Sequence, residues 1–238
     1  MTPAERAALR RAISPDRLAT YVSAAAVRNC DALDLYIWDR DVAAAAMADI
    51  AILEVAMRNA MSAQLAERAG RDDWYSINIG LDTRSLAAVA KAWGQVPQTS
   101  RTPGRVTAQL MFGFWRELLE AGGIIGAGPL KQQADYETIW RSELRKAFPG
   151  GRALAGSEGA QFTRTWTLGI VKDVHALRNR AAHHEPLVNG LPVPGESRRM
   201  TMNEGLNACL RLSALLDRDL HTWMTANSRL VWALAQSI

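Results

Sequence analysis

The side chains best suited to acid–base and phosphate chemistry are concentrated in one segment, positions 174–187. Three of the four histidines of the chain lie there with two arginines and an asparagine: His175, Arg178, Asn179, Arg180, His183 and His184. Histidine can take up or release a proton near neutral pH, as a general acid or base must. Arginine can hold two phosphate oxygens at once. The segment therefore offers groups for proton transfer and for binding phosphate.

Helical periodicity separates this segment into an apolar and a polar face. At about 100° per residue, positions 168–184 form an apolar stripe that should pack on a core, consisting of Ile170, Val174, Leu177 and Ala181. The other side, an arc of about 140°, gathers a cation, an amide and two imidazoles, on Arg178, Asn179, His175 and His183. One helix can therefore pack with one face and present chemistry with the other.

The end of this helix is also predicted. Pro186 disfavours the helical conformation for Glu185, so the helix should end near His183 or His184. A histidine there lies at the negative end of the helix dipole, which favours its protonated form. We therefore expect an imidazole that can change charge at the helix terminus.

These residues resemble the motifs of a known ribonuclease superfamily. Arg178 and His183 stand at the two ends of a run that fits the R-x4-6-H motif of HEPN ribonucleases. The longer run at positions 177–186, Leu-Arg-Asn-Arg-Ala-Ala-His-His-Glu-Pro, resembles the signature of the bacterial Abi-like (abortive infection) branch. Two other stretches are similar to Abi-like motifs: Glu-x3-Arg-Asn, from Glu54 through Arg58 to Asn59, and Phe-Gly-Phe-Trp at positions 112–115. The resemblance covers most of the chain, from position 14 to position 186.

The resemblance implies metal-independent cleavage of single-stranded RNA. The ribose 2′-OH would attack its neighbouring phosphate and leave 2′,3′-cyclic phosphate and 5′-hydroxyl ends. His183 would transfer protons, and Arg178 would hold the phosphate oxygens. The groups expected to bind phosphate or RNA, or to orient that pair, are Asn179, His175 and Arg180. His184 points about 100° away from His183, so we expect a structural role for it. No metal or other cofactor is expected.

The resemblance also implies partners. The chain contains one R-x4-H set, whereas in the family two such sets usually meet across a dimer, so a homodimer with a composite cleft is expected. Abi-like proteins arrest growth in phage defence, in a toxin-like manner, and some are restrained by another molecule. RNA as substrate, a regulatory noncoding RNA and an antitoxin are therefore the expected partners.

Other interpretations of the same residues stay open. A non-catalytic HEPN module could bind RNA or a partner protein through them, and Arg178 and His183 could simply be surface groups. Toxins paired with a nucleotidyltransferase antitoxin resemble R-x4-H-x-Tyr, but here Glu185 holds the last position. A metal site would use His175, His183, Glu185 and Asp173 as ligands. It is disfavoured because two histidines that bind one metal from the same helix are usually four residues apart, whereas these two are eight apart.

Composition is that of an ordinary globular protein. Of 238 residues, 48% are hydrophobic and 22% are charged, and the net charge of +4 is compatible with RNA without being diagnostic. Cys30 and Cys209 are far apart, which argues against a disulfide framework or a zinc site. The N-terminus lacks the apolar run of a secretory signal. The most apolar segment is interrupted by Asp49 and Glu54, so we expect no membrane span and a cytoplasmic location.

The pattern of apolar residues predicts an all-α chain, since no useful alternation of period two is present. A short helix at 33–37 should precede a long one at 41–69, in which Glu54 and Arg58 form an i, i+4 pair that braces the helix bearing Arg178. One long helix should close the chain at 204–232. We expect a single Abi-like HEPN domain over 1–238, an antiparallel bundle with additional helices, in which positions 94–128 form an insertion layer.

Overall fold

The protein is built almost entirely from α-helices in the computed structural model, which describes residues 1–236. The helices are α1 (Pro3–Ala12), α2 (Pro15–Arg28), α3 (Ala32–Ala69), α4 (Thr83–Gln95), α5 (Pro103–Ala108), α6 (Phe112–Glu117), α7 (Tyr136–Ser142), α8 (Gly151–Ser157), α9 (Arg164–Ala182), α10 (Met202–Leu216), α11 (Arg218–Asn227) and α12 (Arg229–Ala235). Short 3-10 turns lie at Trp74–Ser76, Gln98–Ser100, Gly128–Leu130 and Leu144–Ala147. The predicted all-α class is confirmed.

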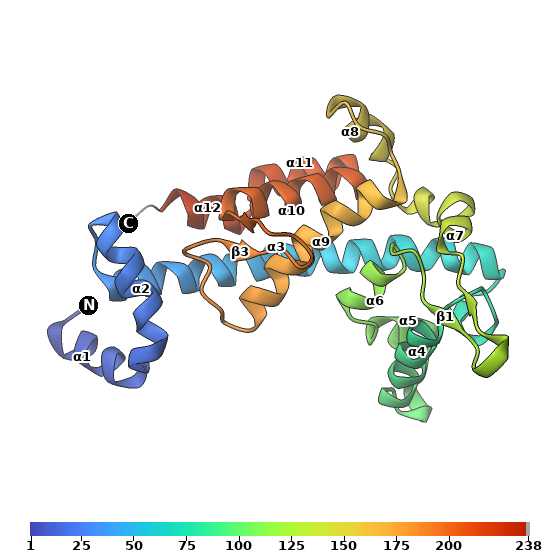
Figure 1. The fold of residues 1–238 in the computed structure, drawn as a ribbon, viewed down its shortest axis with the longest axis horizontal. Coiled ribbons are helices and arrows are strands. Elements are labelled where there is room, and N and C mark those ends of the chain that lie inside the picture. Colours follow the sequence, from blue (N-terminus) through green and yellow to red (C-terminus); the bar gives the residue numbers. More distant parts are fainter. Residues whose placement is uncertain (237–238) are drawn as a thin grey trace.

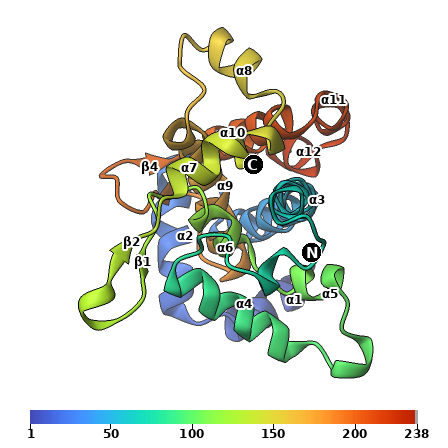
Figure 2. The ribbon, with the colours of Figure 1, turned by 90° about the vertical axis from the view of Figure 1, so that its right-hand side faces the viewer.

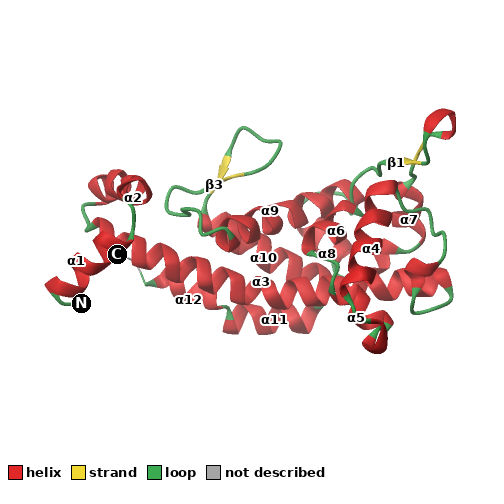
Figure 3. Ribbon diagram, turned by 90° about the horizontal axis from the view of Figure 1, so that it is seen from below, coloured by secondary structure: helices red, strands yellow, loops and turns green. Residues whose placement is uncertain are grey.

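Two small antiparallel hairpins are the strands of the described chain. β1 (Ile124–Ile125) pairs with β2 (Gln132–Gln133), with Ile124 opposite Gln133, and β3 (Leu191–Pro192) pairs with β4 (Arg199–Met200). Figure 3 shows both hairpins at the edge of the helical body. Between positions 1 and 236, no helix is both long and apolar enough to cross a bilayer.

The long helix α3 is the axis of the molecule (Figure 1). α9, α10 and α12 pack along it, α2 contacts it near its beginning, and α6 contacts it closer to its end. Figure 2 shows α10 and α12 on one side of α3 and α4 and α5 on the other, with α9 and α6 next to each other beside it. Its predicted apolar stripe is fully buried, at Ile50, Leu53, Met57, Met61 and Leu65. This burial confirms the face that sequence periodicity predicted.

The predicted interruption of α3 near Asp39 is wrong, because the helix runs unbroken for 38 residues. Asp39 is only 3% exposed. Its carboxylate accepts a hydrogen bond from the Tyr21 hydroxyl at 2.7 Å and from the Leu187 backbone N–H at 3.1 Å. An aspartate that bonds to other elements no longer competes for the backbone of its own helix. Tertiary partners therefore keep α3 continuous.

The single C-terminal helix that we predicted is divided into α10, α11 and α12. Asp217 caps α11 by accepting from the Leu220 N–H at 2.7 Å. Ser228 caps α12 by accepting from the Val231 N–H at 3.0 Å, and its hydroxyl donates to Asp49 of α3. The Asp49 carboxylate also accepts from the Leu230 N–H at 3.1 Å. Side-chain caps at both breaks satisfy backbone groups that a continuous helix would have paired internally.

Candidate functional site

The end of α9 positions two of the motif histidines. The helix ends at Ala182, and His183 occupies the C-cap. His184 has a φ of 55°, in the left-handed region. The backbone N–H groups of His184 and Glu185 bond to two carbonyls of the last turn, which is the pairing of a Schellman motif. The helix therefore ends where the sequence predicted, and the His183 side chain is exposed at its terminus.

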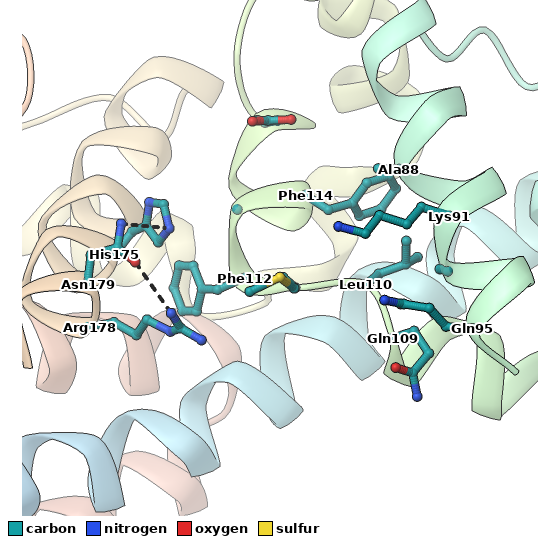
Figure 4. Close-up of a pocket in the computed structure, with 14 residues that line it drawn as sticks. Ala88, Lys91, Gln95, Gln109, Leu110, Phe112, Phe114, His175, Arg178 and Asn179 are labelled. Atoms are coloured by element: carbon teal, nitrogen blue, oxygen red, sulfur yellow. Dashed lines mark hydrogen bonds between the residues drawn. The ribbon is translucent and has the colours of Figure 1, made fainter. Parts of the chain in front are cut away.

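Arg178, Asn179 and His175 are joined by contacts on the polar face of α9 (Figure 4). Arg178 Nη1 donates to Asn179 Oδ1 at 3.5 Å, and Asn179 Nδ2 lies 3.3 Å from His175 Nε2. Because the amide oxygen faces the guanidinium, the amide N–H is directed at the imidazole, whose Nε2 can accept it. The three side chains lie together as helical periodicity predicted. Within residues 1–236, the His183 side chain forms no hydrogen bond with them.

His175 lies against the aromatic side chain of α6. Its ring stacks on Phe112, with the ring centres 5.2 Å apart and the planes 1° from parallel. Burial, followed by the positive charges of Arg116 and Arg178, lowers the pKa of His175 to about 4. At neutral pH this imidazole is therefore uncharged, and it can accept a hydrogen bond from Asn179. It is suited to orienting Asn179 rather than to donating a proton.

The low pKa of His175 predicts how stability depends on pH. Between pH 6.5 and about 4, the unfolded chain binds a proton at this site that the folded chain does not. The free energy of unfolding should therefore be greatest above pH 6.5 and should fall as the pH drops toward 4. The fall should be less than about 3 kcal/mol, because water reaches part of the ring. Urea unfolding at pH 7.5 and 4.5 should show a smaller pH effect in His175→Gln than in wild type. An equal effect in both proteins would contradict this.

Glu54 links α3 to both α6 and α9. One carboxylate oxygen accepts from the Phe112 N–H at 3.1 Å, and the other lies 3.9 Å from Arg178 Nε. This Arg178 nitrogen is buried and has no hydrogen-bond partner among residues 1–236. The expected pair of Glu54 with Arg58 does not form, because the carboxylate turns to these two distant partners instead. Arg58 is partly buried and Asn59 is exposed, and neither touches the motif residues through a hydrogen bond in the described chain.

Glu54 should therefore contribute to stability and to the placement of Arg178 together. Glu54→Gln keeps an acceptor for Phe112 but removes the charge beside Arg178, and should cost about 1 kcal/mol of unfolding free energy. Glu54→Ala leaves both partners unpaired and should cost about 2–3 kcal/mol. Denaturant unfolding, and an assay of the RNA cleavage that the resemblance implies, should show stability and cleavage falling in the same order in both variants. Activity lost without any loss of stability would instead make Glu54 a catalytic residue.

The polar face of α9 forms one wall of a cleft of about 440 Å³. Arg178, Asn179 and His175 line it on this side, and α6 forms the floor. The opposite wall carries polar side chains that belong to none of the sequence motifs, namely Lys91, Gln95 and Gln109. Figure 4 shows Lys91 pointing from α4 toward Phe112. Residues 88, 91, 92 and 95 share a helical face by their spacing, but the spacing does not say which cleft that face lines.

The remaining predicted residues lie outside this cleft. Arg180 pairs with Glu185, and Asp173 pairs with Arg198 at 3.4 Å. His184 borders a separate cavity of about 610 Å³ between α2, α3 and the end of α9. Of the four ligands of the metal alternative, His175 is in the cleft, His183 is exposed at the helix end, and the two acids have their own arginines. They do not gather into a cluster of the kind that holds a metal, and residues 1–236 contain no such cluster elsewhere.

Chemically, the cleft combines a guanidinium, an ammonium group and amides with a floor of aromatic and thioether side chains. Such a site suits a ligand that has an anionic group beside a flat ring. Comparison with protein-family models, curated proteins and solved structures finds no match for this chain. What the cleft acts on must therefore be inferred from its own residues and from the motif they carry.

Proposed function

We propose that this chain is a HEPN-type endoribonuclease, similar to Abi-like proteins, that cleaves single-stranded RNA without a metal ion. One observation supports it above all. The last turns of α9 direct Arg178 and Asn179 into a cleft and leave His183 exposed at the helix end, a few residues away. A phosphate-binding group and a group that can transfer protons are thus presented by one helix terminus. The helices around α3 would then be a HEPN bundle with additional helices.

The proposed reaction needs no group from outside the protein and RNA. The ribose 2′-OH loses its proton to a base and attacks the adjacent phosphorus, and the bond from phosphorus to the 5′-oxygen breaks. An acid protonates that leaving oxygen, so the products are a 2′,3′-cyclic phosphate and a 5′-hydroxyl. His183 would take part in the proton transfers. Arg178 would hold the non-bridging oxygens, whose charge increases in the transition state.

Product analysis in the presence of a chelator tests the proposal. Purified protein is incubated with end-labelled single-stranded RNA in excess EDTA. We expect cleavage to persist and to yield 2′,3′-cyclic phosphate ends. Loss of activity in EDTA, with recovery on adding a divalent cation, would favour a metal-dependent reaction instead.

A homodimer is the expected assembly, because one chain contributes one Arg178–His183 set and the reaction uses two proton transfers. A second copy would supply the other histidine across a twofold axis. Light scattering at micromolar concentration should give twice the 26.1 kDa mass of one chain. A monomer that retains full cleavage activity would rule out a composite site.

A second function has its own supporting observation. The histidine inside the cleft is His175, which is uncharged at neutral pH, whereas His183 lies outside the set of residues that line it. The cleft could therefore bind RNA or a partner protein without cleaving it. RNA binding by wild type with no cleavage of varied substrates would favour this function. In either case a role in phage defence, with a regulatory RNA or an antitoxin as partner, is part of the proposal.

A further inference from the structure

We propose that the cleft between α9 and α4 binds a single unstacked nucleotide next to the cleaved phosphate, and that Gln95 and Gln109 recognise its base. The proposal rests on the ribonuclease function above, and it assigns substrate recognition to the wall opposite the motif. Residues 94–128, expected from sequence to be an insertion layer, would then contribute to choosing the RNA.

The opposite wall has polar groups that no other part of the described chain uses. Lys91, Gln95 and Gln109 are all exposed, and their side chains have no hydrogen-bond or ion-pair partner among residues 1–236. By contrast, Glu117, the carboxylate that lines the cleft, is already paired with Arg84 at 3.0 Å. The unpaired groups are thus a cation and two amides. Their donors and acceptors are free to meet a ligand.

The floor between the two walls suits a base. Met111 is 62% exposed and lies over Leu110, Phe112 and Phe114, which are at most 5% exposed. The exposed Met111 thioether, backed by these buried apolar side chains, is a surface on which an unstacked base can lie. A volume of about 440 Å³ lies in the range of small-ligand sites. A base within a duplex could not enter, so the pocket would itself select single-stranded RNA.

A positively charged side chain lies on each side of this floor. Arg178 comes from α9 and Lys91 from α4, and Figure 4 shows Lys91 directed across the cleft toward the α9 side. A nucleotide within RNA has a phosphate before it and another after it. Arg178 would hold the reacting phosphate, and Lys91 would contact the neighbouring one. Gln95 and Gln109 carry both donors and acceptors, as recognition of a base edge requires.

Binding measurements on an inactive protein test this separately from cleavage. Fluorescently labelled ten-nucleotide RNAs of each base are titrated into His183→Ala protein by anisotropy. We expect at least a tenfold preference among the four bases. Adding Gln95→Ala and Gln109→Ala should reduce that preference to within about twofold. Lys91→Ala should weaken binding of all four RNAs by about fivefold to tenfold. It should also reduce the slope of log affinity against log salt concentration by about one, the value for one phosphate contact.

Exposed residues outside the cleft supply matched controls. Lys131→Ala and Gln132→Ala, on the β1–β2 hairpin, should leave affinity and base preference unchanged. Four results would each overturn the pocket. The protein could bind no RNA, or it could bind all four bases equally. The base preference could survive removal of both glutamines, or Lys91→Ala could have no effect. If base preference depends on the glutamines but wild type never cleaves, the pocket stands and the ribonuclease proposal fails. If the Lys91, Gln95 and Gln109 variants all cleave RNA as fast as wild type, the ribonuclease proposal stands and the nucleotide pocket fails.

Discussion

Replacing His183 with alanine is expected to reduce RNA cleavage by about a hundredfold or more, because proton transfer by a positioned side chain typically contributes that much. The fold should be unaffected. The side chain is exposed at the C-cap of α9, and the Schellman bonds there involve backbone groups alone. Rates on labelled RNA and thermal melting by circular dichroism give the two quantities. We expect the melting temperature to stay within about 2 °C of wild type, as for surface substitutions in general.

The adjacent histidine provides a matched control for His183. His184 occupies the left-handed position of the helix end, a conformation that asparagine tolerates. His184→Asn should therefore keep the helix end and retain most of the activity. Equal losses in His183→Ala and His184→Asn would point to the shape of this turn rather than to proton transfer. Full activity in His183→Ala would remove this residue from the reaction.

Changing Arg178 to lysine is expected to reduce cleavage by a similar factor, about a hundredfold, although the charge is conserved. A lysine ammonium is a point charge and cannot hold two phosphate oxygens in the planar geometry of a guanidinium. It would also give up the contact with Asn179 Oδ1 and the approach to Glu54. The fall should appear in the rate at saturating RNA, because the developing phosphorane charge is what the guanidinium stabilises.

Arg180 is the matched control for this substitution. It is two residues away on the same helix, but it pairs with Glu185 and does not line the cleft. Arg180→Lys should leave cleavage within about twofold of wild type, since this partly exposed ion pair lies outside the cleft and lysine keeps its charge. A large loss in this variant would place RNA on the outer side of α9 and require a different path for the substrate.

Features that depend on a single helix follow from the amino-acid sequence. The 3.6-residue period sets the directions of side chains within one helix, and it correctly predicts that His175, Arg178 and Asn179 lie together on one face of α9. His183, predicted on the same arc, lies at the C-cap and does not line the cleft. The same period identifies the buried stripes of α3 and α9. Pro186 indicates the end of α9 to within a residue or two. These inferences hold because local backbone geometry does not depend on what the helix packs against.

Contacts between distant segments depend instead on the tertiary structure. Glu54 bonds to a backbone group 58 positions away and approaches Arg178, rather than its neighbour Arg58. Asp39 sits inside a continuous helix because its partners come from α2 and from the segment after α9. The pKa of His175 is low because α6 buries the ring and brings Arg116 close to it. Lys91 faces the motif only because α4 and α9 meet across α6, and periodicity within a helix carries no information about which helices become neighbours.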